Sequence, residues 1–565
     1  MNRRIQLISA TVAVVVFIAL SAFVIHKFAP SKDVMDLNEY FSVSESSEDM
    51  AIILQDSVCE EKGLFIEGVP YLSYEMITEL FNHRFYWDKN EQLLLYTTPD
   101  KLIKAQPDTG EYLINKSNDT KEYNIVTVKN DVVYVAMPFV QEYSNITFET
   151  FDQPNRIVIQ YKWDISELVS TVKKDTVVRY EDSIKSPILT EVIAGDELIH
   201  VDTSEELERG FSKVVTKDGI IGYVKEKKLS ESSYREKVSS FTPPVYAHIT
   251  KDYDINMVWH QVTTYATNDS LLTLLNSTKG VNTISPTWFA IKDNEGNISS
   301  IASEYYVTRA HQAGVEVWGL CNDFSQDIDL SLILGRTSSR ERLANKLIST
   351  AIEYNLDGIN IDFENITSDN GADFIQFLRE ISIKCRNNGI VLSVDNYIPT
   401  EYRAYYDYEE QGVVADYVVI MAYDEHYSGS EQAGSVSSLG FVSEAANNIL
   451  AMVDKERVIM ALPFYTRLWK TKGDKAPNSE AYSMSGIMSV LQNNGVKASW
   501  DEATGQYYAE YREGDYVCQV WLEEEKSLAE KLKAITALGI HNVSFWRLGF
   551  EKSEVWNAVA EYINK

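Results

Sequence analysis

The stretch Leu-Asp-Gly-Ile-Asn-Ile-Asp-Phe-Glu, residues 356–364, combines a strand-like pattern with three polar residues. Asn360, Asp362 and Glu364 alternate with apolar residues. Because successive side chains of a β-strand point to opposite faces, the three polar groups are expected to share one face. Burying unpaired carboxylates costs free energy, so packing alone does not explain this face. It predicts either a chemical site at the end of a strand or an ion-paired cluster in a core.

The surrounding sequence places this strand in a repeating pattern. Helical segments separate eight strand candidates, which are residues 255–262, 282–289, 315–320, 358–363, 390–394, 417–422, 458–464 and 543–547. One helical segment is 339–354, with Leu343, Leu347, Ala351 and Tyr354 on one face and Ser339 as a plausible N-cap. Eight strand–helix units in about 320 residues predict a (β/α)8 TIM barrel, an α/β fold. Active sites of such barrels lie at the carboxyl ends of the strands, which favours the chemical site.

Residues 470–526 have helix and strand patterns of their own and are expected to form an α+β insert before the eighth strand. Phe-Thr-Pro-Pro at 241–244 marks the boundary before the barrel, which is expected over residues 245–565.

Several motifs of the barrel resemble glycoside hydrolase family 18, the chitinase-like family. Its signature is Asp-Gly-x-Asp-x-Asp-x-Glu, and residues 357–364 are similar to it. Further similar stretches are Met-Ala-Tyr-Asp at 421–424, Leu-Pro-Phe-Tyr-Thr-Arg at 462–467 and Ser-Phe-Trp-Arg-Leu-Gly at 544–549. The nearer likeness is to the bacterial branch with spore-cortex and cell-wall lytic enzymes. Two departures are Asn360 in place of the middle Asp, and Ile-Ser-Pro-Thr-Trp-Phe at 284–289 in place of the usual Ser-x-Gly-Gly.

The resemblance implies a substrate-assisted mechanism that retains the anomeric configuration. Glu364 is then the general acid, Asp362 orients the sugar acetamido group, and Tyr423 donates a hydrogen bond to its carbonyl. The nearby Asp362 charge helps to keep Glu364 protonated. The expected substrate-binding residues are Trp546, Asp424, Met421, Asn360, Tyr465, Arg467 and Trp288. Trp259, Trp288 and Trp318 are either sugar platforms or core aromatic residues, and the sequence leaves both interpretations open.

No cofactor and no metal site are expected. The four cysteines have no Cys-x-x-Cys spacing and the eight histidines are scattered. The Cys side chains are expected to be buried free thiols.

The first 30 residues indicate export. Arg3 and Arg4 precede an uncharged run from Ile5 to Ile25. As a helix this run is about 31 Å long, enough to cross a bilayer core. The segment is expected to be a single-pass membrane anchor, and the alternative is a signal peptide cleaved near Ala19. In either case the rest of the chain is extracytoplasmic.

Two smaller domains are expected before the barrel. Residues 37–163 contain a weak repeat that begins at Val69 and Val133, and they resemble the small N-terminal "stalk" domain of copper amine oxidases. Residues 164–232 resemble bacterial SH3-type domains, and Asp-Gly at 218–219 predicts a hairpin. The SH3-like domain either binds a cell-wall ligand or is a spacer.

Charge excludes one class of partner. Lys and Arg number 52 against 83 Asp and Glu, a net charge of −31, so no nucleic acid is expected as a partner. The favoured function is an exported glycosidase acting on β-linked N-acetylglucosamine glycans, peptidoglycan first and chitin oligomers second. The alternatives are a non-catalytic glycan-binding protein on the same barrel and an assembly protein. Lectin-like relatives usually lack the final Glu of the signature, so the presence of Glu364 favours the enzyme.

Overall fold

The computed structural model describes residues 2–44, 47–202, 207 and 210–562. Its contacts divide the chain into two compact units. The first unit spans 1–87, 93–96 and 103–243, and the second spans 88–92, 97–102 and 244–565. The second unit contains the strand–helix repeats and therefore holds the site of interest.

The first unit begins with helix α1 (Asn2–Phe28). Within it, Ile8–Phe28 is long and apolar enough to cross a membrane, by length and composition, and it is the only such helix among the described residues. None of this segment is buried against the rest of the structure. An anchor and a signal sequence share these properties, so both alternatives for residues 1–30 stay open.

Two sheets follow α1 and the short helix α2 (Leu37–Phe41). The first has the order β11-β12-β1-β2-β3-β10-β9 and the second runs from β4 to β8. The strands of the first sheet are β1 (Asp49–Leu54), β2 (Ser57–Ile66), β3 (Val69–Ser73), β9 (Val126–Lys129), β10 (Val132–Ala136), β11 (Thr147–Phe151) and β12 (Arg156–Gln160). Those of the second are β4 (Phe85–Asp88), β5 (Leu93–Thr97), β6 (Leu102–Ala105), β7 (Glu111–Ile114) and β8 (Ser117–Thr120).

The sequence repeat corresponds to two strand–helix units. Strands β3 and β10 are antiparallel neighbours. Each leads directly into a seven-residue helix, α3 (Tyr74–Leu80) or α4 (Met137–Tyr143).

A third sheet of the first unit has the order β15-β14-β18-β17-β16-β13-β19. Gly219 has a φ of +81° in the turn between β17 and β18, a conformation that glycine adopts without strain. The strands are β13 (Ile165–Thr171), β14 (Thr176–Arg179), β15 (Ile188–Val192), β16 (Glu197–His200), β17 (Phe211–Val215), β18 (Ile221–Lys225) and β19 (Ser233–Lys237), with the 3-10 helix η1 (Glu226–Lys228).

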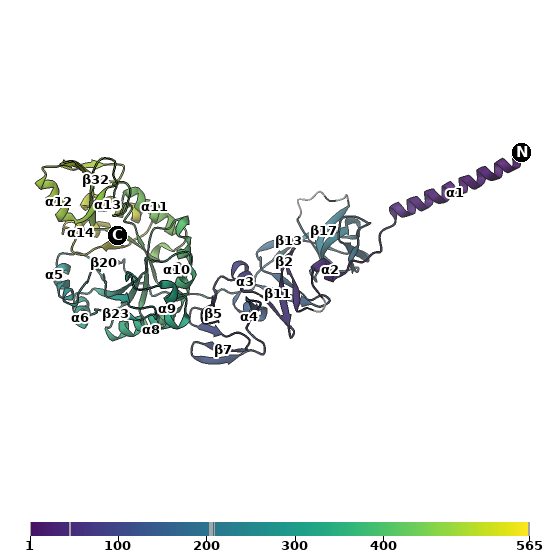
Figure 1. The fold of residues 1–565 in the computed structure, drawn as a ribbon, viewed down its shortest axis with the longest axis horizontal. Helices are drawn as coiled ribbons and strands as arrows, with labels where there is room; N and C mark the ends of the chain where they lie inside the picture. Colours follow the sequence, from purple (N-terminus) through teal and green to yellow (C-terminus); the bar gives the residue numbers. More distant parts are fainter. Residues whose placement is uncertain (1, 45–46, 203–206, 208–209, 563–565) are drawn as a thin grey trace. The chain divides into compact units, whose positions relative to one another are not determined.

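The second unit is a closed barrel of eight parallel strands, drawn from teal to yellow in Figure 1. Closure comes from β20, which pairs with both β21 and β34. The strands are β20 (Asn256–His260), β21 (Thr283–Pro286), β24 (Glu316–Asn322), β25 (Gly358–Asp362), β26 (Val391–Asn396), β27 (Tyr417–Met421), β28 (Val458–Pro463) and β34 (Asn542–Trp546). The predicted (β/α)8 fold is therefore confirmed. A short hairpin, β22 (Phe289–Ile291) and β23 (Ile298–Ser300), extends the sheet beside β24.

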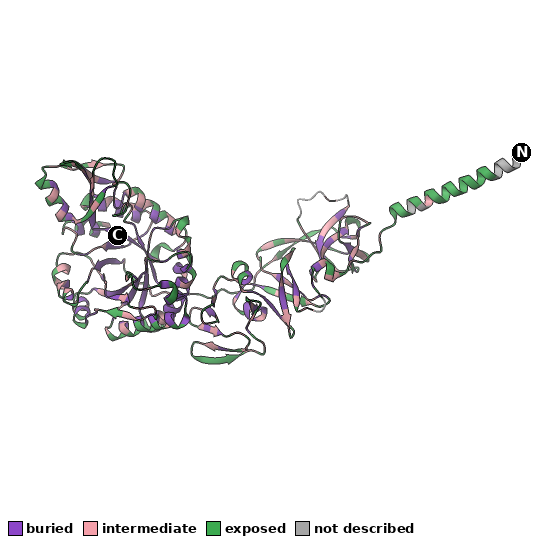
Figure 2. Ribbon diagram, in the orientation of Figure 1, coloured by how far each residue is buried: buried purple, intermediate pink, exposed green. Residues whose placement is uncertain are grey.

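Helices surround the strands, and Figure 2 shows buried strands with helices exposed on their outer sides. One apolar layer fills the space between strands and helices. A smaller cluster lies inside the barrel and contains Trp259, Trp318 and Tyr417. The helices are η2 (Tyr265–Ser270), α5 (Leu271–Leu275), α6 (Glu304–Gln312), α7 (Leu330–Leu334), α8 (Thr337–Glu353), α9 (Gly371–Asn388), η3 (Glu401–Tyr406), α10 (Tyr408–Val414), α11 (Leu439–Leu450), η4 (Lys455–Arg457), α13 (Glu525–Ala537) and α14 (Val555–Tyr562).

The expected insert lies between β28 and β34 and begins slightly earlier than predicted, at Tyr465. It is a five-stranded sheet in the order β30-β29-β33-β32-β31 with one helix. Its elements are β29 (Tyr465–Thr471), β30 (Asn478–Ser483), α12 (Met484–Asn493), β31 (Ser499–Asp501), β32 (Gln506–Glu513) and β33 (Tyr516–Leu522).

The predicted N-cap of α8 is wrong. The helix begins at Thr337 rather than after Ser339, and Ser339 is buried. The Asp88 carboxylate of the same compact unit accepts hydrogen bonds from the backbone and the hydroxyl of Thr337, each at 2.6 Å. A cap supplied from a distant segment leaves no local signal beside the helix.

Candidate active site

Strand β25 directs Asn360 and Asp362 to the inside of the barrel, and Glu364 follows two residues later. Ile361 and Phe363 pack in the opposite direction, into the layer between strands and helices. The alternation predicted from the sequence is therefore present.

Asn360 links neighbouring barrel strands at the base of the site. It is completely buried, its Oδ1 accepts from Trp259 Nε1 at 2.9 Å and Ser285 Oγ at 3.0 Å, and its Nδ2 donates to Ser393 Oγ at 3.0 Å and Asp395 Oδ1 at 2.7 Å. A side-chain amide offers two donors and two acceptor positions, so all four are used. The amide thus joins β25 to β20, β21 and β26, and the substrate-binding role expected of Asn360 stays a prediction.

Strand β26 supplies a matching set of polar residues. Asn360 is in register with Ser393, and Ile361 with Val394. The next inward residues of the two strands are therefore Asp362 and Asp395. Beyond the end of β26, the Tyr397 hydroxyl donates a hydrogen bond to Glu364 Oε2.

Asp323 fixes the backbone at the point where Glu364 leaves the strand. Its carboxylate accepts from the backbone N–H of Glu364 at 3.1 Å and of Asn365 at 2.9 Å. Asp323 is almost fully buried and directly follows β24.

Burial and neighbouring charges raise the pKa of two carboxyl groups at this end of the barrel. Burial, followed by the charges of Asp395, Glu364 and Asp323, raises the pKa of Asp362 well above its ordinary value. Burial also raises the pKa of Glu364, the Tyr397 hydrogen bond lowers it, and the charges of Asp323 and Asp424 raise it. A Glu with a raised pKa at a strand end suits general acid catalysis near neutral pH.

Tyr423, Asp424, Tyr465 and Arg467 come together after β27 and at the start of β29. The Tyr465 hydroxyl donates to Asp424 Oδ1 at 2.6 Å, and Arg467 Nε lies 3.8 Å from the same oxygen. The rings of Tyr423 and Tyr465 are 6.3 Å apart, edge to face. Asp424 is exposed, so the group presents a carboxylate at the surface.

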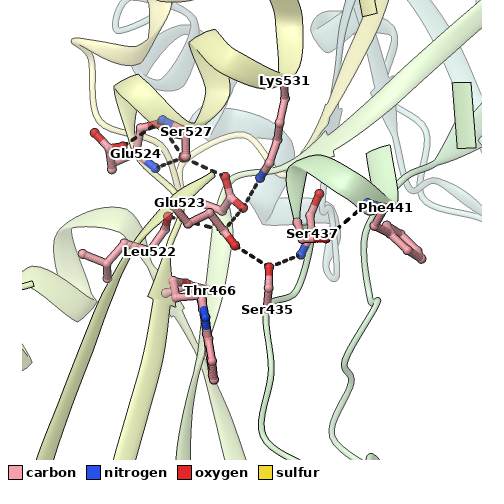
Figure 3. A network of polar contacts seen from close by, with 12 residues as sticks. Ser435, Ser437, Phe441, Thr466, Leu522, Glu523, Glu524, Ser527 and Lys531 are labelled. Atoms are coloured by element: carbon pink, nitrogen blue, oxygen red, sulfur yellow. Dashed lines mark hydrogen bonds and ion pairs between the residues drawn. The ribbon is translucent and has the colours of Figure 1, made fainter. Parts of the chain in front are cut away.

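A buried polar network fixes the segment that follows Asp424 (Figure 3). Ser437 Oγ donates to the backbone oxygen of Ala422 at 2.7 Å, and the Ser437 N–H donates to Ser435 Oγ at 2.9 Å. Ser435 Oγ in turn donates to the side chain of Gln506 on β32. The loop after β27 is thereby tied to the insert.

The same network ends in a buried ion pair. Gln506 Nε2 donates to Glu523 Oε1 at 2.6 Å, and Glu523 pairs with Lys531 on α13. Both charged side chains are 0% exposed. Burial raises the pKa of Glu523 to about 7 and lowers that of Lys531.

The aromatic residues fall into two groups. Trp546 is half-buried and lies edge to face with Trp259, 5.9 Å between ring centres, so it remains available at the barrel mouth. Trp288 is 2% exposed, packs on Tyr306 and donates to Asn268 Oδ1 at 2.8 Å. Trp288 therefore packs in the apolar layer outside the strands, and its expected contact with substrate stays a prediction. Trp259 and Trp318 are also core residues, and Met421 is nearly covered.

Sequence reasoning missed Asp323, Asp395 and Tyr397. The signal for two of them was present, because Ser393, Asp395 and Tyr397 alternate at a strand end as the signature residues do. Asp323 lies beyond the predicted end of the third strand and had no such pattern.

Comparison with known proteins agrees with this geometry. Residues 322–551 match the model of the glycosyl hydrolases family 18. The barrel is thus similar to this family over most of its length. Residues 55–159 match the copper amine oxidase N-terminal domain, as expected from the sequence.

The barrel part of the chain has relatives among bacterial proteins. The chain is 26% identical over 296 residues to YvbX of Bacillus subtilis (strain 168), an uncharacterized glycosylase, covering 49% of this chain and 84% of YvbX. It is 24% identical over 247 residues to the cortical fragment-lytic enzyme of Bacillus anthracis, covering 42% of this chain. The match spans 57% of that enzyme's length.

Solved structures show the same fold. The spore cortex-lytic enzyme SleL of Bacillus cereus aligns with a TM-score of 0.50 at 19% identity, over 59% of this chain and 79% of SleL. A chitinase of Chromobacterium violaceum aligns with a TM-score of 0.50 at 18% identity, over 55% of this chain and 99% of the chitinase. The family match and the relatives support glycosidase activity for the barrel.

Proposed function

We propose that this protein is an exported glycosidase that hydrolyses β-linked N-acetylglucosamine glycans by a retaining, substrate-assisted mechanism. The observation that carries the proposal is Glu364, a half-buried carboxyl group with a raised pKa just beyond the end of β25, two residues after Asp362. The named relatives are a glycosylase and a cortical fragment-lytic enzyme, which supports the same class of reaction.

The first step breaks the glycosidic bond. Protonated Glu364 gives its proton to the glycosidic oxygen, while the carbonyl oxygen of the sugar's own acetamido group attacks the anomeric carbon. Asp362 accepts a hydrogen bond from the acetamido N–H and stabilises the positive oxazolinium ion that forms. Tyr423 donates a hydrogen bond to the acetamido oxygen.

The second step returns the proton. The Glu364 carboxylate removes a proton from water, and the water oxygen attacks the anomeric carbon and opens the oxazolinium ring. Two inversions at one carbon give net retention. Tyr397 stabilises Glu364 while it is ionised, because its hydroxyl donates to Oε2.

The substrate in the cell follows from the N-terminal part of the chain. The apolar segment of α1 is proposed to anchor the protein in a membrane, with the barrel on the outer face. The domain over residues 37–163 and the SH3-like domain over 164–232 are proposed as spacers or cell-wall-binding modules. Peptidoglycan is the N-acetylated polymer at that location in bacteria, so it is the favoured substrate, and chitin oligomers are weaker surrogates.

The test uses the full-length chain, purified in detergent, on peptidoglycan and on chitin oligomers. Glu364→Gln is expected to lower turnover by about a hundredfold or more, the usual scale of general acid catalysis. Glu353→Gln, an exposed position at the end of α8, is the matched control and is expected to leave activity unchanged. Reducing N-acetylglucosamine ends on peptidoglycan support the assignment.

Four outcomes contradict parts of the proposal. If Glu364→Gln keeps nearly wild-type activity, Glu364 is not the general acid. If the new reducing ends on peptidoglycan are N-acetylmuramic acid, the assignment of peptidoglycan as the substrate in the cell is refuted. Rapid hydrolysis of chitin with no product released from peptidoglycan refutes it as well. Binding of glycan by the wild-type protein without any hydrolysis leaves the non-catalytic glycan-binding protein as the better interpretation.

A further inference from the structure

Two neighbouring parallel strands of the barrel, β25 and β26, carry polar residues at matching positions near the barrel mouth. On β25 these are Asn360 and Asp362, and on β26 they are Ser393 and Asp395. Both strands are parallel and in register, so partner residues project to the same side. Adjacent strands are about 4.8 Å apart, which brings the Asp362 and Asp395 side chains within reach of each other.

The carboxylate absent from position 360 is present on the next strand. The family signature has Asp where this chain has Asn360, so β25 has one acid fewer than expected. Asp395 is 2% exposed and accepts from Asn360 Nδ2 at 2.7 Å. The base of the site in this chain therefore contains a carboxyl group on β26, directly bonded to the amide that stands at position 360.

The surroundings of this carboxyl pair contain further acids. Glu364 on the extension of β25, Asp323 after β24, Tyr397 after β26 and Tyr423 after β27 all face this region. Burial raises the pKa of Asp362 and of Asp395 well above the ordinary value for Asp. Two close buried carboxyl groups do not both ionise readily, so one proton remains in the pair.

One oxygen of Asp362 is poorly satisfied. Asp362 Oδ1 is buried and has no hydrogen-bond partner among the described residues. An ionised Asp395 has no donor to offer it, whereas a single proton held between the two carboxyl groups provides one. The unpartnered oxygen and the repulsion between the two carboxylates therefore both indicate that the pair holds one proton.

We propose that Asp395 is a positioning residue that shares one proton with Asp362 and retains that proton when Asp362 ionises toward the substrate. This inference rests on the proposed function of Asp362 as the group that stabilises the oxazolinium ion. The proton moves from Asp362 to Asp395, so Asp362 gains its negative charge as positive charge forms on the sugar. No water and no external base take part in that transfer.

The test reads the carboxyl protons directly. The pH titration of the neutral-carboxyl infrared band is followed in the full-length wild type and in Asp395→Asn, and the difference spectrum cancels the other buried acids. Loss of the neighbouring carboxylate is expected to lower the titration midpoint of the band by about one pH unit or more. The swap Asn360→Asp/Asp395→Asn returns the missing acid to β25 and is expected to bring the midpoint back up.

The matched control is Ser393→Ala, which removes the other acceptor of Asn360 and keeps both carboxyl groups. It is expected to leave the midpoint at the wild-type value. If the midpoint is unchanged in Asp395→Asn, the proposal of a shared proton is refuted. It is also refuted if Ser393→Ala lowers the midpoint equally, and Asp395 then has only a packing role. If Asp395→Asn does not fold, the swap variant decides, and a midpoint in the ordinary range for Asp overturns the proposal.

Activity on peptidoglycan and on chitin oligomers is measured on the same wild-type sample. The absence of both activities refutes the proposed function, whereas the infrared titration still decides whether Asp362 and Asp395 share a proton. The two failures are therefore distinguishable.

Discussion

Replacing Tyr397 by Phe removes one hydroxyl from the catalytic centre and isolates its effect on Glu364. The hydroxyl donates to Glu364 Oε2, which favours the ionised carboxylate and lowers the pKa of Glu364. Burial and the charges of Asp323 and Asp424 act in the opposite direction and are unchanged by the substitution. The pKa of Glu364 is therefore expected to rise in Tyr397→Phe.

The size of the rise follows from the hydrogen bond. A hydrogen bond to a charged group contributes about 1.5–3 kcal/mol, and about 1.4 kcal/mol corresponds to one pKa unit. Both side chains are half-buried, so the lower end applies and the expected rise is about one unit. The general acid must be protonated in the first step, so the alkaline limb of the rate profile moves to higher pH.

The assay is kcat/KM on a chitin oligomer across pH, because that ratio reports the ionisations of the free enzyme. Tyr408→Phe is the matched control, since its hydroxyl donates to the backbone oxygen of Tyr397 at 3.2 Å and positions the same segment. An alkaline limb that stays in place or moves down in Tyr397→Phe refutes the reasoning. An equal shift in Tyr408→Phe assigns the effect to backbone position.

Three further results are expected. Lys531→Met leaves the buried Glu523 without its cation and is expected to cost about 3–5 kcal/mol of stability near neutral pH, measured by denaturant unfolding, whereas Lys531→Met/Glu523→Gln recovers most of it. Because the folded-state pKa of Glu523 is raised, the loss in Lys531→Met is smaller at pH 5 than at pH 8, and equal losses contradict the burial argument. Trp288→Ala is expected to lower the free energy of unfolding by about 3–5 kcal/mol with little change in KM for oligosaccharide, and a large rise in KM with unchanged stability contradicts its assignment to the core. Substrates with a free amine at C2 are expected not to be cleaved and a thiazoline analogue to inhibit, whereas a covalent sugar trapped on Asp362 contradicts substrate assistance.

The fold was predictable because its information is local and periodic. Eight apolar segments separated by helical patterns defined the barrel, and the alternation around Asp362 placed the carboxylates at a strand end. The start of α8 was not predictable, because the cap comes from Asp88, about 250 residues earlier.

The site was predictable only in part, for a related reason. Residues on one strand share a face by periodicity, which correctly grouped Asp362 with Glu364. The roles of Asn360 and Asp395 depend on the register between β25 and β26, which a single sequence does not state. Trp288 shows the same limit, because a Trp beside a strand end has the same pattern whether it faces the mouth or the surrounding helices.

The insert between β28 and β34 has a consequence for how this protein can be re-engineered. Gln506 from the insert joins Ser435 of the loop after β27 to Glu523, and Glu523 neutralises Lys531 of α13. A deletion that removes the sheet of the insert takes Gln506 away and leaves polar groups of the loop and helix without partners in a dry interior, which is costly. The insert is therefore not a detachable module: a graft of it onto another barrel has to carry the loop after β27 and the first turns of α13 along with it.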